Sequence, residues 1–324
     1  MTIRYSVIVP VFNNQDSITR LVSVLTEFRL TQMRDLEVVF VIDGSHDQSR
    51  EILVKELQSG ALDAQVIDLS RNFGSFSAIR AGLLSARGDL IAVMAADLQE
   101  PISLVEDFFS RLETGRCDIV VGRRLSRNDP FVSSFIARSY WKFYRRLVSS
   151  DYPTGGVDSF GCTRKVAEVL NALGEKNTSL VGLLYWIGFR REEVPYDRKR
   201  RHSGRSGWTF GRKFRYFSDS VFAFSTLPLK VIQVVGFGGT LSSVLVGLIV
   251  VLAWITGTVS ISGYVPIMLA ILGSASMILL ALGVIGSYVW RTYENSQHRP
   301  VVVQRSRRLF GYGVEDLSRK GDEL

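Results

Sequence analysis

Two long apolar stretches toward the C-terminal end constrain this chain more than any other feature. Leu229 to Ile255 and Tyr264 to Trp290 are each longer than the roughly 20 residues with which a helix crosses the hydrocarbon core of a bilayer. Trp254 and Tyr288 lie near the ends of these stretches, where interfacial aromatic residues are common. A buried helical hairpin in a soluble protein is the less favoured alternative, because both stretches exceed the transmembrane length. The sequence therefore predicts a two-helix transmembrane hairpin over residues 229–290.

The charges of the chain lie mostly outside these stretches. The net charge is +8, and very little charge lies between Lys230 and Arg291. The connection over residues 256–263 carries no charge, whereas basic residues flank the other ends, so the positive-inside rule places both termini in the cytoplasm. A basic balance suits a membrane surface or a phosphorylated substrate, and in a chain that enters a bilayer it does not favour nucleic acid. Cys117 and Cys162, the only cysteines, have no zinc-site or disulfide spacing, which is typical of a reducing compartment.

The part of the chain before residue 209 alternates short apolar runs with amphipathic stretches. The runs have the length of buried strands, and the stretches repeat apolar residues with helical spacing. The predicted strands are Ser6–Val11, Leu36–Ile42, Ala64–Leu69, Leu90–Ala96 and Asp118–Gly122. The predicted helices are Ile18–Phe28, Gln48–Leu57, Ser77–Ala86, Pro101–Leu112 and Val166–Leu173. Because strands and helices alternate, the predicted fold class is α/β with a mostly parallel central sheet.

A carboxylate, Asp97, follows the predicted strand Leu90–Ala96. Gln99 comes two residues later, and in an extended segment its side chain would lie on the same side as that of Asp97. A carboxylate and an amide oxygen together suit a hard cation that accompanies a diphosphate. The alternative is that Asp97 only caps the helix that follows.

Other predicted strands also end in polar groups. Asp43 follows the second strand, residues 70–74 follow the third, and Arg124 follows the last, with Arg127 just beyond. The carboxyl ends of parallel strands share one edge of a sheet, and ligands bind at that edge. The sequence therefore predicts a site for a nucleotide diphosphate and a metal ion at this edge.

Four sequence motifs, in their order along the chain, resemble those of a known family. They are the segments SVIVPVFN at 6–13, DGSHD at 43–47, SRNFG at 70–74 and DLQEP at 97–101. Together they resemble the nucleotide-sugar domain of the GT-A, family 2 glycosyltransferases. The similarity extends to the polyprenyl-phosphate group, which includes dolichyl-phosphate mannose synthases, bactoprenol glucosyltransferases and the undecaprenyl-phosphate aminoarabinose transferase. The resemblance implies inverting transfer of a sugar from a nucleotide diphosphate, with a UDP-sugar favoured, to polyprenyl (undecaprenyl) phosphate for a cell-envelope glycan or lipid.

The resemblance also implies which residues form the site. Asp97 and Gln99 match the metal contacts of the family, for Mg²⁺ or Mn²⁺. The residues implied in nucleotide binding are Pro10, Phe12, Asn13, Asp43, Arg71, Gly74 and Ala96. The residues implied in catalysis are Asp97, Arg124, Arg127, Asp158, Arg201 and Ser206. The arginines and Ser206 would hold the acceptor phosphate through charge-assisted hydrogen bonds, and Asp158, a loose match, would lie near the transferred sugar.

Two positions depart from the family pattern. Ile42 stands where the family has the first Asp of Asp-Asp-Gly-Ser, and Ala95 stands where it has the first Asp of Asp-x-Asp. These departures motivate an alternative function, a catalytically silent membrane partner that keeps the fold but only binds nucleotide or lipid. A processive polysaccharide synthase is less favoured, because two spans are too few for a channel and no Gln-x-x-Arg-Trp segment is present.

Segments around the predicted hairpin suggest contact with the bilayer surface. Asp129 to Ser150 is aromatic and basic, so it would lie at a membrane interface or, equally, pack its aromatic side chains against the head. Residues 1–208 form the predicted catalytic domain, 209–228 an amphipathic interfacial helix and 291–324 a cytoplasmic tail. Within the tail, Val301 to Val303 would add an edge strand to this chain or to a neighbouring subunit. We expect a multi-pass protein of the bacterial inner membrane that contacts membrane lipids, and the resemblance implies a homo-oligomer, with a tetramer favoured.

Overall fold

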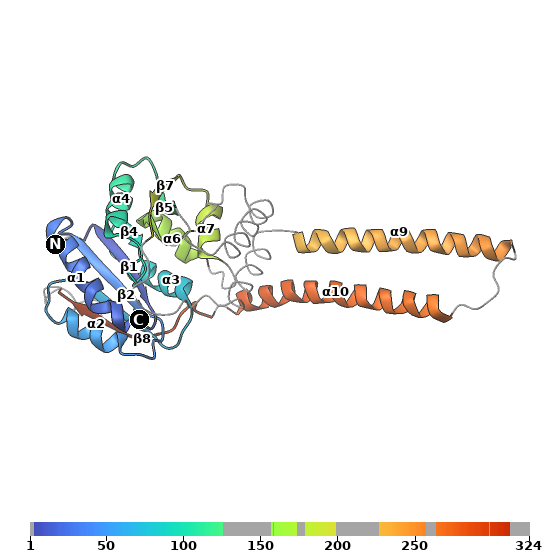
Figure 1. Ribbon diagram of the computed structural model, residues 1–324, viewed down its shortest axis with the longest axis horizontal. Coiled ribbons are helices and arrows are strands. Elements are labelled where there is room, and N and C mark those ends of the chain that lie inside the picture. The colour runs from blue at the N-terminus through green and yellow to red at the C-terminus, as the bar shows by residue number, and fades with distance from the viewer. Residues whose placement is uncertain are drawn as a thin grey trace.

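The computed structural model consists of an α/β head from which two long helices extend (Figure 1). It describes residues 3–125, 157, 159–173, 179–198, 227–256, 264–297 and 299–311. The predicted helix Asp129–Ser150, residues 199–208 and the predicted interfacial helix at 209–228, apart from its last two residues, lie outside the described residues. The predicted domain boundaries therefore stay predictions.

The head is organised around one sheet, which has eight strands among the described residues, in the order β7-β5-β6-β4-β1-β2-β3-β8. The strands are β1 (Tyr5–Val11), β2 (Leu36–Ile42), β3 (Ala64–Leu69), β4 (Leu90–Val93), β5 (Ile119–Arg124), β6 (Phe160–Thr163), β7 (Arg191–Tyr196) and β8 (Gln304–Phe310). Strands β4, β1, β2 and β3 are parallel to one another, β6 is antiparallel to both β4 and β5, and β8 is antiparallel to β3. The prediction of an α/β fold with a mostly parallel sheet is confirmed.

Helices connect the strands and cover both faces of the sheet (Figure 1). The described helices are α1 (Gln15–Thr31), α2 (Ser49–Leu57), α3 (Ser75–Ser85), α4 (Ile102–Glu113), α6 (Arg164–Ala172), α7 (Leu180–Trp186), α9 (Leu227–Ile255) and α10 (Tyr264–Ser296). Each helix that the sequence predicted in the described part of the head is present, with its ends shifted by a few residues. Strands β6 and β7 and helix α7 were not predicted.

The core has two layers, one on each face of the sheet. Phe40 of β2 belongs to the layer that contains apolar residues of α1, α2 and α4, and its neighbour Val41 belongs to the layer that contains residues of α3, α6 and α7. Every residue of β2 is buried. This arrangement explains why the parallel strands read as continuous apolar runs rather than as an alternating pattern.

Strand β4 is shorter than predicted. It ends at Val93 rather than Ala96, although the N–H of Met94 still donates to the carbonyl of Ile8 at 3.1 Å. The next amide, that of Ala95, donates instead to Oε2 of Glu100 at 3.3 Å, and Leu98 has a φ of 53°. The chain therefore leaves the sheet in a turn held by a buried carboxylate, and the prediction of an extended segment as far as Ala96 is wrong.

The chain returns to the head after α10. The sequence suggested an edge strand at Val301–Val303, and the structure has it slightly later, as β8 (Gln304–Phe310), paired with β3 of the same chain. This strand covers the edge that β3 would otherwise expose.

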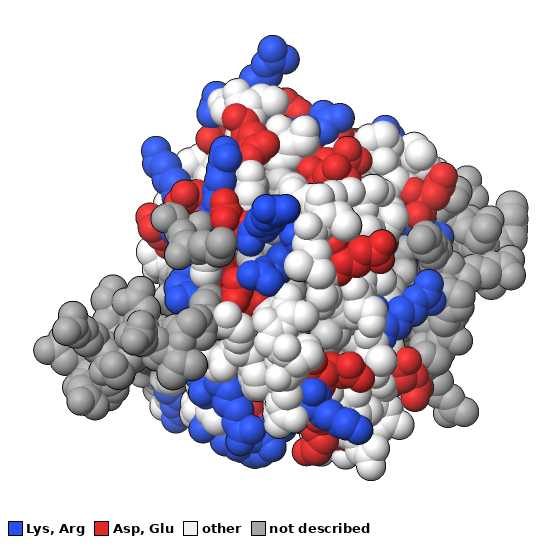
Figure 2. Space-filling view, turned by 90° about the vertical axis from the view of Figure 1, so that its left-hand side faces the viewer, with Lys and Arg blue, Asp and Glu red and all other residues white. Residues whose placement is uncertain are grey.

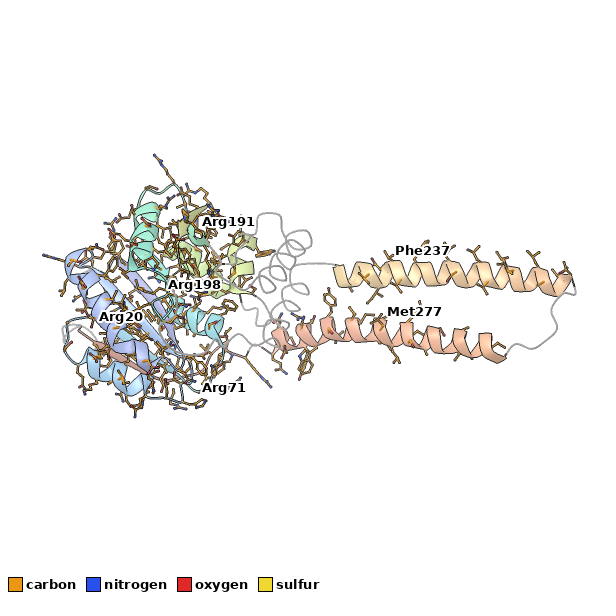
Figure 3. The ribbon with its side chains drawn as sticks, viewed as in Figure 1. Arg20, Arg71, Arg191, Arg198, Phe237 and Met277 are labelled. Carbon is orange, nitrogen blue, oxygen red and sulfur yellow. The ribbon has the colours of Figure 1, made fainter. Side chains whose placement is uncertain are left out.

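The two long helices coincide with the predicted apolar stretches. Helices α9 and α10 run side by side in opposite directions, and Met277 of α10 points toward α9 (Figures 1 and 3). A Cβ added to Gly239 of α9 would lie 2.5 Å from Cε of Met277, so the flexible end of that methionine packs against this glycine. Within the described residues, one segment, Gly273–Ser296, has both the length and the mean hydropathy, 1.6, of a membrane-spanning helix.

The end of the head away from the long helices has a mixed surface. Lys and Arg side chains are interspersed there with Asp and Glu, and uncharged residues separate them (Figure 2). Such a mixture is typical of a solvated surface.

Candidate functional site

The candidate site lies where the central parallel strands end. Strands β1, β2, β3 and β4 point the same way, so the loops that follow them share one edge of the sheet. These loops comprise residues 12–14, 43–48, 70–74 and 94–101. Ligands of open α/β sheets bind at such an edge.

The loop after β1 is joined to the loop after β2. Asn13 has a φ of 53°, a left-handed conformation that Asn tolerates better than most residues. Its N–H donates to Oγ of Ser45 at 3.2 Å, and its Oδ1 accepts from the N–H of His46 at 3.0 Å. Of the other predicted nucleotide-binding residues nearby, Pro10 pairs with Val41 inside the sheet, and Phe12 lies in this loop. The polar atoms of Asn13 thus position the neighbouring loop.

The loop after β2 is joined in turn to the loop after β3 by Asp43. This side chain is 2% exposed, and its two oxygens accept from the N–H groups of Phe73 at 2.7 Å and Gly74 at 2.9 Å. Burial raises the pKa of Asp43 above its ordinary value, while the two amides and the charge of Arg71 oppose that rise. The Asp43 side chain therefore links the loop after β2 to the loop after β3.

Gly44 allows these two loops to touch. It has a φ of 62°, and a Cβ at this position would lie 2.5 Å from the backbone carbon of Arg71 and the backbone nitrogen of Asn72. No other residue fits there without moving the loop. The Gly of the Asp-Gly-Ser motif is thus required by the close approach of residues 70–74.

Arg71 and Gly74 lie at the outer part of this loop. The Arg71 guanidinium lies over the Phe73 ring, 4.4 Å from its centroid, and Arg71 is exposed at the rim of the head (Figure 3). Gly74 precedes α3 with a φ of 93°, and no atom lies within 4 Å of the place where its Cβ would be. Both positions are open to a ligand that approaches the edge of the sheet.

The turn after β4 brings Asp97 and Gln99 together. The backbone N–H of Gln99 donates to Oδ1 of Asp97 at 3.3 Å, and the left-handed residue between them is Leu98, with a φ of 53°. A non-glycine residue in this conformation costs about 1 kcal/mol or more, and such residues cluster at functional sites. The two residues therefore belong to one turn rather than to an extended segment, so the geometry from which the sequence argument paired them is wrong.

The alternative role for Asp97 as a helix cap is not observed. Helix α4 begins at Ile102, its N-cap residue is Pro101, and no side chain makes a cap hydrogen bond there. Ala96, also predicted near the nucleotide, is buried beside Asp97. Asp97 is therefore held at the edge of the sheet, where it can serve a ligand.

The donor atoms of this turn fit a small divalent cation. Gln99 is 8% exposed, and its Oε1 is buried without a hydrogen-bond partner. Leaving a buried acceptor unsatisfied costs about 1–3 kcal/mol, so the site gains if a cation binds there. The part of the chain that the structure describes holds no cluster of three or more His, Cys, Asp or Glu that could bind a metal alone. A carboxylate and an amide oxygen are ligand types that Mg²⁺ and Mn²⁺ accept, with phosphates and water as the remaining ligands.

Arg124 ends β5 on the same side of the sheet. Strand β5 is antiparallel to β6, which is antiparallel to β4, so β5 and β4 end at the same edge. Arg124 is half-buried there and pairs with Tyr196 of β7. The other predicted catalytic residues, Arg127, Asp158, Arg201 and Ser206, lie outside the described residues.

Sequence reasoning missed two supports of the site. Glu100, 2% exposed, holds the Ala95 amide, and its position inside the DLQEP segment was the available signal. The carbonyl of Val303 accepts from the N–H of Ser70 at 2.9 Å, so the tail supports the loop after β3. No local pattern could have revealed that second contact, because its partners lie far apart in the sequence.

Comparisons with known proteins identify the family of this chain. The family model of glycosyl transferase family 2 matches residues 6–170, from β1 into α6. An uncharacterised glycosyltransferase from the cyanobacterium Synechocystis is 32% identical over 305 residues, which cover 93% of this chain and 94% of that protein. The bactoprenol glucosyl transferase of Shigella phage SfV is 29% identical over 300 residues, which cover 92% of this chain and 96% of that protein.

A solved structure shows a weaker likeness. Glucosyl-3-phosphoglycerate synthase from Mycobacterium tuberculosis, in complex with Mn²⁺, UDP-glucose and phosphoglyceric acid, has a TM-score of 0.46 and 15% identity, covering 68% of this chain and 78% of that one. The classification rests instead on the family model and on the relatives that align over nearly the whole chain. This chain is a glycosyltransferase and belongs to glycosyl transferase family 2.

Proposed function

We propose that this enzyme transfers a sugar from a nucleotide diphosphate, with a UDP-sugar favoured, to polyprenyl phosphate at the cytoplasmic face of the bacterial inner membrane. The observation that carries the proposal is the Asp97–Gln99 turn at the carboxyl edge of the sheet, with its buried, unpartnered amide oxygen. The relatives named bactoprenol glucosyl transferase support a lipid-linked acceptor, since they align with both the head and the long helices.

The donor would bind across the loops after β1 to β4. Asp97 and Gln99 would hold the divalent cation, which supplies Lewis-acid neutralisation of the leaving diphosphate. Arg71 lies exposed on the adjoining loop and can donate to phosphate oxygens with both charge and direction. Asn13 and Asp43 act as links between the loops, so their part in donor binding is to fix the shape of the edge.

The acceptor needs no strong base. A phosphate monoester has a second pKa near 6, so its oxygen is largely ionised at neutral pH. That oxygen attacks the anomeric carbon of the sugar, the bond from this carbon to the diphosphate oxygen breaks, and the nucleoside diphosphate leaves with the electron pair. A single displacement of this kind inverts the anomeric configuration. Arg124, together with Arg127, Arg201 and Ser206, would hold the attacking phosphate against the repulsion of the leaving group.

The long helices would place this chemistry at the bilayer. A polyprenyl chain stays in the hydrocarbon layer, so its phosphate is reached only at the membrane surface. Helix α10 includes the candidate span Gly273–Ser296, and α9 lies beside it. We propose that both helices cross the membrane and anchor the head there.

The proposal is tested with the full chain in detergent or lipid vesicles. A panel of radiolabelled nucleotide sugars is supplied with undecaprenyl phosphate and Mn²⁺ or Mg²⁺, and label in the organic phase is counted. We expect one donor, a UDP-sugar, to label the lipid, and chelation of the metal to stop the reaction. Nucleotide binding without lipid labelling from any donor would instead favour the silent binding partner that Ile42 and Ala95 suggested.

A further inference from the structure

We call the edge of the sheet formed by the loops at residues 12–14, 43–48, 70–74 and 94–101 the donor edge. The tail of the chain contacts this edge at the loop that follows β3. Strand β8 follows α10 after residues 297–303, and it pairs antiparallel with β3 along that strand's whole length. The register shifts between Asp68 and Leu69, just before the loop that follows β3. The tail therefore reaches the point where β3 leaves the sheet and residues 70–74 begin.

Both backbone polar groups of Ser70 are held by the tail. Its N–H donates to the carbonyl of Val303 at 2.9 Å, and its carbonyl accepts from Nη2 of Arg305 at 3.1 Å. Nη1 of the same guanidinium lies 4.0 Å from Oδ2 of Asp68, a buried carboxylate that also pairs with Arg50 at 3.3 Å. Arg305 thus joins the end of β3 to the first residue of the loop.

The loop is held from its other side by Asp43. That carboxylate binds the amides of Phe73 and Gly74, and Gly44 packs directly against the backbone of Arg71. Residues 70–74 are therefore fixed at their beginning by the tail and at their end by the loop after β2. A shift at Ser70 would move Arg71, an exposed cation of the donor edge.

We propose that Arg305 is a positioning residue of the donor site. It holds the loop at residues 70–74 in place through its hydrogen bond to Ser70 and does not touch the donor. The inference rests on the proposed function for the identity of the ligand, and on the contacts above for the role. Residues 297–303 join α10 to β8 and span at most about 25 Å when extended. Because β8 is paired with β3, this short connection also keeps the donor edge close to the end of α10.

A second arginine of β8 gives a contrast. Arg307 binds Oε1 of Gln65 through Nε at 3.1 Å and Nη2 at 2.6 Å, and Gln65 in turn donates to the buried Glu37 at 2.9 Å. This contact lies in the first half of β3, away from the loop. Arg307 therefore attaches the strand to the sheet, whereas Arg305 attaches the strand to the loop.

The test uses the full chain with Arg305→Ala, Arg305→Lys and Arg308→Ala. Arg308 is exposed on the same strand and serves as the matched control. Loss of one charge-assisted hydrogen bond to the loop is expected to raise the KM for the nucleotide sugar about fivefold, with kcat close to that of wild type. Arg305→Lys should recover part of the loss, because an ammonium can also donate to the Ser70 carbonyl. Arg308→Ala should match wild type.

Hydrogen exchange gives a second readout that needs no substrate. We expect the amides of residues 70–74 to exchange faster in Arg305→Ala, and those of Arg308→Ala to exchange as in wild type. Wild-type KM and wild-type exchange in Arg305→Ala would overturn the inference, as would equal effects of both alanine variants. Arg307→Ala should lower the melting temperature with little change in KM, which separates attachment of the strand from positioning of the loop.

Failure of the proposed function would look different. If the wild-type protein labels no lipid from any donor, the proposed acceptor is wrong, and exchange at residues 70–74 still decides the role of Arg305. If the wild-type protein is active and Arg305→Ala is unchanged in both measurements, the proposed function stands and the positioning role is wrong.

Discussion

The backbone N–H of Gln99 donates to Oδ1 of Asp97 at 3.3 Å, across a left-handed Leu98. This contact places a carboxylate and a buried, unpartnered amide oxygen in one turn at the edge of the sheet. Helix capping does not account for the turn, because α4 begins without a side-chain cap. Under the proposed function, Asp97 and Gln99 would hold a divalent cation, which would give both side chains a role.

Asp97→Ala is expected to lower the transfer rate at least about a hundredfold, since it removes the charged ligand that would hold the metal against the leaving group. The rate is measured against Mn²⁺ concentration in lipid vesicles. Asp89→Ala is the control, because Asp89 is exposed and precedes the same strand. Transfer at the wild-type rate by Asp97→Ala would remove the proposed metal site.

Gln99→Leu should separate stability from activity. Leucine has a similar volume and removes the unsatisfied buried oxygen, so we expect the free energy of unfolding to rise by about 1 kcal/mol. The melting temperature would rise by about 3 °C. The same variant should need more metal for half-maximal transfer, because one ligand is lost. A lower melting temperature together with unchanged metal dependence would mean that Gln99 has only a packing role.

The pKa of Asp43 predicts a pH effect on stability. Burial raises this pKa in the folded protein, so between the unfolded and folded pKa values the folded state binds more protons than the unfolded state. The contribution of Asp43 to stability is therefore complete below the unfolded pKa and is lost as pH rises through the folded pKa.

Asp43→Asn does not titrate and is the reference for this effect. Melting temperatures of both proteins are compared from pH 4 upward, and the wild-type protein should lose stability relative to the variant as pH rises. A difference that stays constant across this range, or that changes in the opposite direction, would show that burial of the Asp43 carboxylate does not raise its pKa.

The orientation of the long helices can be tested with fused reporters. If α9 and α10 both cross the membrane, a reporter inserted in the connection at 257–263 faces the periplasm, and one placed after Leu324 faces the cytoplasm. Activity of both reporters on the same side would mean that the chain crosses fewer times than proposed, and the anchoring of the head would need another explanation.

How much could be predicted from the sequence depends on how local the determining contacts are. Strand β2 was predicted at both ends, because Leu36 to Ile42 is apolar almost throughout and buried on both faces. Strand β8 was found only approximately, since Gln304 to Phe310 is largely polar and its partner β3 lies far away in the sequence. Long-range pairing of an edge strand leaves little local signal.

The site shows the same limit. Motif resemblance identified Asp97 and Gln99, but the turn that joins them contains Leu98, a residue type that gives no warning of a left-handed conformation. Asp43 was predicted beside the nucleotide, and the structure shows its carboxylate bound to amides of the next loop. Residue types and spacing therefore indicated which loops form the candidate site, while the roles of its supporting residues came from contacts between loops.

The most direct test of the central claim is the mass of the lipid product together with the yield of nucleoside diphosphate. Wild-type protein supplied with the donor that the panel identifies, undecaprenyl phosphate and Mn²⁺ should add one sugar to each lipid phosphate and release one nucleoside diphosphate for each product, and Asp97→Ala should do neither. Release of the diphosphate without a glycosylated lipid, or an equal lipid yield from Asp97→Ala, would contradict the account.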